Sequence, residues 1–239
     1  MNTALTPAVF TLTVLPALTA SVAVVFLTME DEAAVAQYAS VLALAYLLGS
    51  VPWGYLLLRW RLGVDIREFG SGRTGMSNVL RTGGGKAASL VFVLDVAKGV
   101  LVVMLARVVI GTTEAEVAAG LFALVGHNWP VFLQFRGGRG ILTGFGSLLT
   151  MAPFAGVAAA LAFLIITLLS RYVSLGSITG VIIGGFTLLG LGLVGIYSST
   201  YVLYILFGGA IIIWQHRDNI KRIRQGSERR LGQPATPII

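Results

Sequence analysis

Long apolar stretches, separated by short polar segments, cover most of the chain. With few charges between them, they occupy residues 4–28, 41–58, 87–110, 117–135, 141–170, 175–194 and 201–214. A helix needs about 20 mostly apolar residues to cross a bilayer. The single-residue alternation that is typical of membrane β-strands is absent from the sequence. The pattern therefore predicts an all-α, polytopic membrane helix bundle.

One of these stretches is expected to form two helices. Residues 141–170 are too many for a single span, and the stretch contains Pro153. Proline lacks a backbone N–H and clashes with the preceding helical turn. We therefore expect a short helix over residues 141–151 and a full span after it, which gives eight spans in all.

The charged residues separate between the two sides of these expected spans. On one side lie 15 of the 17 basic residues, namely Arg59, Arg61, Arg67, Arg73, Arg81, Lys86, Arg136, Arg139, Arg171, Arg217, Lys221, Arg222, Arg224, Arg229 and Arg230. The other side receives Glu30, Asp31, Glu32, Arg107, Glu114 and Glu116. Because cytoplasmic loops of membrane proteins are enriched in Lys and Arg, we expect the basic side to be cytoplasmic.

The first apolar stretch allows two interpretations, a cleaved signal peptide or a retained helix. It is longer than the apolar part of an ordinary signal peptide, and no Lys or Arg precedes it. We favour a retained extra helix within residues 1–35, with a cytoplasmic N-terminus. Residues 36–216 then form the membrane core, and residues 217–239 form a basic cytoplasmic tail.

Composition agrees with this pattern and narrows the chemistry. Of the 239 residues 56% are hydrophobic and only 11% are charged, whereas a soluble domain carries about 25% charged residues. The absence of cysteine excludes a disulfide framework, a thiolate nucleophile and a cysteine-based metal site. The net charge of +7 suits anionic lipids or phosphorylated substrates as readily as nucleic acid.

The first of three polar, glycine-rich segments is FGSGRTGMSNVLRTGGGK, residues 69–86. Glycine lets backbone N–H groups approach an anion, and Ser, Asn and Arg side chains add further donors. The spacing is not that of a P-loop. The segment is therefore either a phosphate-binding element or a flexible basic loop.

The second segment is GHNWPVFLQFRGGRG, residues 126–140, in which glycines surround Arg139. A guanidinium in a glycine-rich bend suits a phosphate or carboxylate, because its donors form a rigid fork. A tight turn with a charge that sets topology is the alternative.

The third segment is HRDNIKRIRQGSE, residues 216–228, for which a basic amphipathic tail on anionic lipid is a strong alternative.

Two charges lie within an expected span. Asp95 and Lys98 are three residues apart, so they share one helix face and can pair. Ionisable residues inside a span are functional candidates, and a self-satisfied ion pair is the structural alternative. A metal site is not expected, since His127 and His216 lie far apart without an acidic cluster beside them.

Six pieces of the chain, taken in order, resemble one family. They are LLGSVPWGY at 47–55, the segment from Gly70 to Thr82, LDVAKG at 94–99, residues 126–140, RYVSLGS at 171–177, and residues 216–228. In these pieces the chain resembles the bacterial acyl-phosphate:glycerol-3-phosphate acyltransferases, the PlsY family. The resemblance covers about residues 40–228.

The resemblance implies a fold and a reaction. The fold is that of seven family spans with the motifs on the cytoplasmic side, to which residues 1–35 add an extra helix. The family transfers an acyl chain from acyl phosphate to the 1-hydroxyl of glycerol 3-phosphate, giving lysophosphatidic acid in phospholipid synthesis. It uses no cofactor or metal, and a soluble partner enzyme supplies the acyl phosphate. The implied location is the bacterial plasma membrane, with membrane lipid as a partner and no role for nucleic acid.

Residues carry over motif by motif. We expect catalytic roles for Ser71, Arg81, His127, Arg139, Asn219 and Glu228. We expect substrate contacts from Gly70, Gly72, Asn78, Lys86, Lys98, Gly137, Gly138, Gly140, Ser174 and Ser177. The group that takes the hydroxyl proton is left open between His127, Glu228 and a substrate phosphate oxygen. An acyl phosphate is already activated, so no covalent nucleophile is required.

The chain also departs from the family pattern. Arg73 stands where the first motif usually has Asn, Met76 and Ser77 replace Ala and Thr, and Arg139 stands where Lys is usual. Arginine and lysine differ in donor geometry, so the last change is not neutral. The alternatives are a divergent paralogue with another acceptor or a non-catalytic lipid-binding role, and a small-solute transporter. A transporter would be expected to show an internal repeat and helices broken at mid-membrane.

Overall fold

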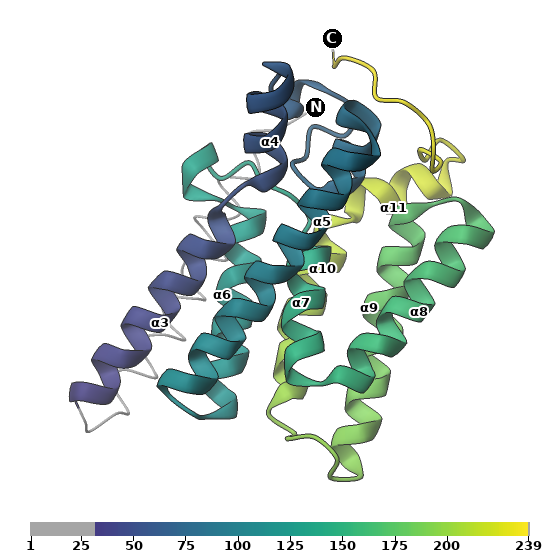
Figure 1. Ribbon diagram of the computed structural model, residues 1–239. Helices are drawn as coiled ribbons and strands as arrows, with labels where there is room; N and C mark the ends of the chain where they lie inside the picture. The colour runs from purple at the N-terminus through teal and green to yellow at the C-terminus, as the bar shows by residue number, and fades with distance from the viewer. Residues whose placement is uncertain (1–31, 239) are drawn as a thin grey trace.

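The protein is an all-helical bundle within the residues that the computed structural model describes, 32–238 (Figure 1). The α-helices are α3 (Glu32–Ser50), α4 (Trp53–Leu62), α5 (Met76–Val109), α6 (Thr113–Asn128), α7 (Ile141–Met151), α8 (Pro153–Ser170), α9 (Val173–Leu193), α10 (Tyr201–Gln215) and α11 (Arg217–Arg224), with short 3-10 turns η2 (Ile66–Glu68) and η3 (Val131–Leu133). The predicted extra helix within residues 1–35 lies almost entirely outside the described residues.

Among the described residues, four helical segments are long and apolar enough to cross a membrane: Ala33–Leu62, Met76–Val109, Pro153–Ser170 and Val173–Leu193. Helices α7 and α10 are apolar but shorter. The predicted membrane helix bundle is therefore confirmed.

The predicted span at residues 41–58 is interrupted in the structure. Helix α3 ends at Ser50, and α4 begins at Trp53 after a break at Val51 and Pro52. Proline accounts for the break because it removes a backbone donor and keeps the preceding residue out of helical geometry. Residues 41–58 still lie within one candidate span, Ala33–Leu62, so the predicted span stands, but Pro52 divides it into two helices.

Helix α5 begins earlier than the apolar pattern predicts, at Met76 rather than near residue 87. The early part is joined to the rest through a kink at Gly84, where φ is 81° and ψ is 178°. That backbone conformation is essentially restricted to glycine. The helical turns before the kink therefore carry Asn78 and Arg81, whereas the apolar pattern predicted that both residues precede the helix.

The division of residues 141–170 is confirmed. Helix α7 ends at Met151, and α8 begins at Pro153. Proline is favoured at the first helical position because its missing N–H would have no partner there. The short α7 and the full-length α8 therefore match the expected split.

Close helix crossings are made at glycines. A side chain at Gly99 of α5 would overlap the backbone of Thr143 on α7, and one at Gly146 of α7 would overlap Val96 on α5. Small residues let helix backbones approach in membrane proteins, where the hydrophobic effect does not drive association. Ser147 adds a hydrogen bond across this crossing by donating to the carbonyl oxygen of Gly99 at 3.2 Å.

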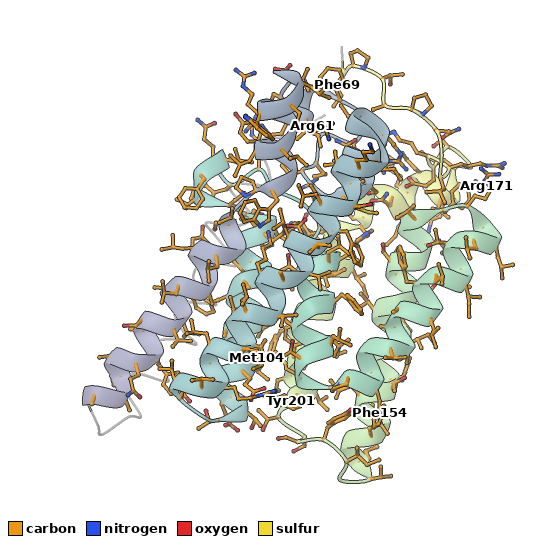
Figure 2. The ribbon with its side chains drawn as sticks, in the orientation of Figure 1. Arg61, Phe69, Met104, Phe154, Arg171 and Tyr201 are labelled. Carbon is orange, nitrogen blue, oxygen red and sulfur yellow. The ribbon has the colours of Figure 1, made fainter. Side chains whose placement is uncertain are left out.

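The two ends of the bundle differ in chemistry. In Figure 2, Arg61, Phe69 and Arg171 lie toward one end, while Met104, Phe154 and Tyr201 lie toward the other. At the second end, Arg107 makes a two-pronged ion pair with Glu116 at 2.7 and 2.8 Å. The first end gathers α4, α11 and the chain after it (Figure 1). It also carries the three glycine-rich segments described next.

Candidate active site

A polar cavity of about 90 Å³ lies where the three glycine-rich segments meet. The first segment and the early turns of α5 supply one wall, and the loop before α7 supplies another. The start of α9 and the chain from His216 onward complete it. Its polar lining residues are Ser71, Arg73, Ser77, Asn78, Arg81, Asp95, His127, Arg139, Ser174, Ser177, His216, Asn219, Arg222, Glu228 and Arg229.

Asn78 organises the first segment from within. Its amide Nδ2 lies 2.9 to 3.3 Å from the carbonyl oxygens of Ile66, Phe69 and Arg73, and its Oδ1 accepts from the Ser71 backbone N–H at 3.1 Å. Gly70 has a φ of 56°, and a side chain there would overlap Asn78 Oδ1. Asn78 thus fixes the loop that presents Ser71 and Arg73.

The glycines of the second segment pack against the end of α6. Gly138 donates its N–H to the carbonyl oxygen of His127 at 3.1 Å, and Gly137 donates to that of Asn128 at 3.2 Å. A side chain at Gly138 would overlap the His127 ring. This close packing positions Arg139, whose Nε donates to the carbonyl oxygen of Gln215 at 3.2 Å.

A buried polar cluster supports this loop. Lys98 Nζ lies 2.9 Å from Asp95 Oδ1 and 2.8 Å from His127 Nδ1, and it also donates to the carbonyl oxygens of Gly49 and Val51 at the end of α3. An ammonium group only donates, so His127 Nδ1 accepts. Lys98 therefore braces α3, α5 and α6 against one another behind the cavity.

Glu228 draws the third segment together. Its Oε1 accepts from Ser174 Oγ at 2.8 Å and Asn219 Nδ2 at 2.6 Å, and its Oε2 accepts from Arg222 Nε at 2.7 Å. Asn219 Oδ1 and Arg222 Nη2 are buried without a hydrogen-bond partner among the described residues. These two groups remain available to a ligand.

The cavity concentrates positive charge. Five arginines line it together with two carboxylates, of which Asp95 is paired with Lys98 and Glu228 with Arg222. Burial and the neighbouring charge of Arg73 lower the pKa of Arg139 to about 9. Burial and the charge of Arg139 lower the pKa of His216 to about 4, so His216 is neutral near pH 7. An anionic ligand would stabilise these buried, neighbouring positive charges.

An apolar cavity of about 260 Å³ adjoins the polar one. Residues of α7, α8, α9 and α10 line it, and Ile141, Leu142, Phe163 and Ser177 line both cavities. The site can therefore hold a molecule with an anionic head and an apolar tail.

Most of the predicted site residues are brought together. The cavity is lined by Ser71, Asn78, Arg81, His127, Arg139, Gly140, Ser174, Ser177, Asn219 and Glu228. The cavity is not lined by Gly70, Gly72, Lys98, Gly137 or Gly138, although Lys98 pairs with the lining residue Asp95. The structure does not bring Lys86 to the site, since it is exposed beyond the kink at Gly84.

Among the lining residues missed by the sequence prediction are four Arg or His residues: Arg73, His216, Arg222 and Arg229. All four lie in or next to the motifs, which was the available signal. His216, Arg222 and Arg229 were not predicted to line the site, because the sequence from residue 216 onward fits a basic tail that lies on anionic lipid equally well.

The family model described as glycerol-3-phosphate acyltransferase matches residues 39–226. The chain belongs to the glycerol-3-phosphate acyltransferase family. The similar curated protein from Dehalococcoides mccartyi, glycerol-3-phosphate acyltransferase 3, is 45% identical over 83% of this chain and 98% of its own. The glycerol-3-phosphate acyltransferase from Thermoanaerobacter pseudethanolicus is 43% identical over 80% and 93%.

Two solved structures of the integral membrane glycerol 3-phosphate acyltransferase PlsY share the fold. The glycerol 3-phosphate form matches with a TM-score of 0.75 and 37% identity, over 82% of this chain and 96% of its own. The lysophosphatidic acid form matches with a TM-score of 0.73 and 35% identity, over 82% and 95%. The resemblance to the PlsY family is therefore confirmed, and the chain is a multi-pass membrane acyltransferase of the glycerol-3-phosphate acyltransferase family.

Proposed function

We propose that the protein transfers an acyl chain from acyl phosphate to the 1-hydroxyl of glycerol 3-phosphate, giving lysophosphatidic acid and phosphate. The observation that carries this proposal is the junction of an arginine-lined polar cavity with an apolar one. The names of the similar PlsY structures, in glycerol 3-phosphate and lysophosphatidic acid forms, support the same substrates.

The phosphate groups of both substrates are expected to bind among the arginines. Arg81 and Arg139 come from different segments and line one small cavity, which suits two phosphorylated molecules that must meet. Holding reactants in the right geometry lowers the barrier by removing the entropy cost of their encounter. The guanidinium groups also stabilise charge that develops on the oxyanion and on the leaving phosphate.

The acyl chain is expected to enter the apolar cavity. The cavity extends along α10 from Ile212, near the polar site, to Tyr204, which is about 12 Å at the rise of an α-helix. Ser177 and Phe163 line the passage between the cavities. The acyl carbonyl then lies at the junction, within reach of the arginines.

The reaction balances without a covalent enzyme intermediate. The glycerol hydroxyl oxygen forms a bond to the acyl carbon, and the bond from that carbon to the phosphate oxygen breaks. The hydroxyl proton finishes on the released phosphate. Glu228 already accepts three hydrogen bonds and His127 Nδ1 accepts one from Lys98. The phosphate oxygen is therefore the proton acceptor that we favour.

The basic end of the bundle is proposed to face the cytoplasm of a bacterial cell, with the bundle in the plasma membrane. The enrichment of Lys and Arg in cytoplasmic loops supports this orientation. A cytoplasmic site gives access to water-soluble glycerol 3-phosphate. It also gives access to a soluble enzyme that produces the acyl phosphate.

A product assay tests the proposal directly. Purified protein is incubated with palmitoyl phosphate and radiolabelled glycerol 3-phosphate, and lysophosphatidic acid is separated and counted. Arg139→Ala is expected to lower kcat/KM by about 100-fold. Arg136→Ala is the matched control, because Arg136 is exposed and lies three residues away from Arg139 without lining the cavity. The absence of product from folded wild-type protein refutes the proposal. If the protein acylates another acceptor but not glycerol 3-phosphate, it is a divergent paralogue.

A further inference from the structure

The chain after Glu228 crosses the basic end of the bundle, and we call residues 229–238 the C-terminal strap (Figure 1). Leu231 donates its N–H to the carbonyl oxygen of Arg171 at 2.7 Å, which ties the strap to the junction of α8 and α9. Ala235 donates to the carbonyl oxygen of Arg81 at 3.3 Å. The strap thus connects distant parts of the cavity wall.

Its last residues pair with the loop that carries Ser71. Gly70 donates to the carbonyl oxygen of Thr236 at 2.9 Å, and Ile238 donates to that of Glu68 at 2.8 Å. These two bonds flank an antiparallel bridge between Phe69 and Pro237. The loop is consequently held by Asn78 on its inner side and by the strap on its outer side.

The strap also brings one more arginine to the cavity. Arg229 lines it, and one terminal nitrogen donates to the carbonyl oxygen of Gly70 at 3.0 Å. A guanidinium has five N–H donors in a planar fork, so this anchor orients the group while other donors remain. The next residue, Arg230, is exposed and stacks over the ring of Tyr172 instead, with 5.9 Å between its guanidinium carbon and the ring centroid.

We propose that the C-terminal strap completes the substrate site, with Arg229 as a further phosphate-binding residue and the Phe69–Pro237 pairing as the element that positions the Ser71 loop. The strap lies beyond residues 39–226, where the family model matches, so the family motifs do not mark it. The proposal rests on the proposed function for the identity of the phosphorylated ligand.

Paired arginine variants test the binding role. Arg229→Ala is expected to raise the KM for glycerol 3-phosphate or for acyl phosphate by about 10-fold or more, since charge-assisted hydrogen bonds contribute about 1.5–3 kcal/mol. Measuring both KM values identifies the phosphate that Arg229 contacts. Arg230→Ala, with its guanidinium on Tyr172, is expected to leave both values within twofold of wild type. Unchanged KM values in Arg229→Ala overturn the binding role.

A disulfide tests the positioning role. The two flanking hydrogen bonds make Phe69 and Pro237 a non-hydrogen-bonded pair, whose Cα atoms lie about 4.5 Å apart in such ladders. That spacing suits a disulfide, and the chain has no cysteine of its own. In the double variant Phe69→Cys/Pro237→Cys we expect oxidation to form the bond, detected by mass spectrometry, and the oxidised enzyme to match the rate of its reduced form.

Two outcomes overturn the positioning role. Failure of the disulfide to form means that the strap does not pair with the loop. Loss of activity on oxidation, recovered on reduction, means that the strap must leave the loop during turnover. The proposed function is tested separately by the wild-type protein in the same assay, because disulfide formation is read without substrate.

Discussion

Among single residues, Glu228 joins α9 to α11, because it accepts hydrogen bonds from Ser174 of α9 and from Asn219 and Arg222 of α11. In Glu228→Gln the new amide can no longer accept on both sides, so either Asn219 or Arg222 loses its partner. Leaving a buried donor or a charged group unpaired costs more than the bond itself contributes. We expect kcat/KM to fall by roughly 10–100-fold, while Glu68→Gln, which alters an exposed acid at the same end, stays near wild type. A Glu228→Gln enzyme with wild-type kinetics would contradict this role.

His216 is expected to make the stability of the protein depend on pH. Burial and Arg139 lower its pKa to about 4, whereas an unfolded chain has the ordinary value of about 6.5. Between these values the unfolded chain takes up a proton that the native protein does not, so stability is expected to fall as pH drops from about 6.5 to 4. The measurement is the melting temperature in detergent across that range.

The matched variant is His216→Asn, whose amide retains a donor for the carbonyl oxygen of Ile212, the partner of His216 Nδ1 at 2.8 Å. It removes the titrating ring, so its melting temperature is expected to decline less on acidification than that of wild type. Parallel pH profiles for the two proteins would show that His216 does not titrate as described.

The sequence motifs predicted many of the residues that line the cavity. Ser71, Arg81 and Arg139 lie in glycine-rich segments, and the structure places all three at one cavity. The inward direction of His216 and Arg222 was not predictable, because it depends on how α11 lies against the bundle. Lys86 illustrates the converse, since a basic residue in the right segment is turned away by the kink at Gly84.

At the scale of elements, the kink in α5 sets the position of Arg81 relative to the membrane part of the helix. Gly84 has a backbone conformation that costs other residues about 1–3 kcal/mol. We therefore expect Gly84→Ala to lower the melting temperature and to reduce activity through displacement of Arg81. Gly85→Ala is the matched control, because its φ is not positive and open space surrounds it.

In the control, alanine is expected to be neutral or to stabilise the helix by about 0.5–1 kcal/mol. Equal melting temperatures for the two variants would argue against a required kink. Helix boundaries lie at both Pro52 and Pro153, and the sequence analysis predicted only the one at Pro153. A run of three glycines, residues 83–85, did not reveal which one bends the helix.

At the scale of the whole molecule, the two cavities form one path from the basic end into the apolar interior. Ala160 of α8 lines the apolar cavity nearly one turn beyond Phe163, which lines both. Ala160→Leu is expected to lower kcat/KM for palmitoyl phosphate by about 10-fold relative to octanoyl phosphate. The larger side chain would occupy space for the longer acyl chain, and each methylene that loses its place in an apolar pocket costs about 1 kcal/mol or more of binding free energy. Ala158→Leu, on the same helix but outside both linings, is the control. An unchanged chain-length preference would place the acyl chain elsewhere.

The separation of charge between the two ends was predictable from the sequence, because topology requires only a count of spans and of basic residues. It leads to a test on a chain that has no cysteine. Glu114→Cys, at the start of α6, and Arg224→Cys, at the end of α11, place single thiols at opposite ends of the bundle. In sealed right-side-out vesicles, a membrane-impermeant maleimide is expected to label position 114 and to reach position 224 only after the vesicles are permeabilised. Labelling of both from one side would contradict the orientation, whereas activity in the product assay confirms that each variant is folded.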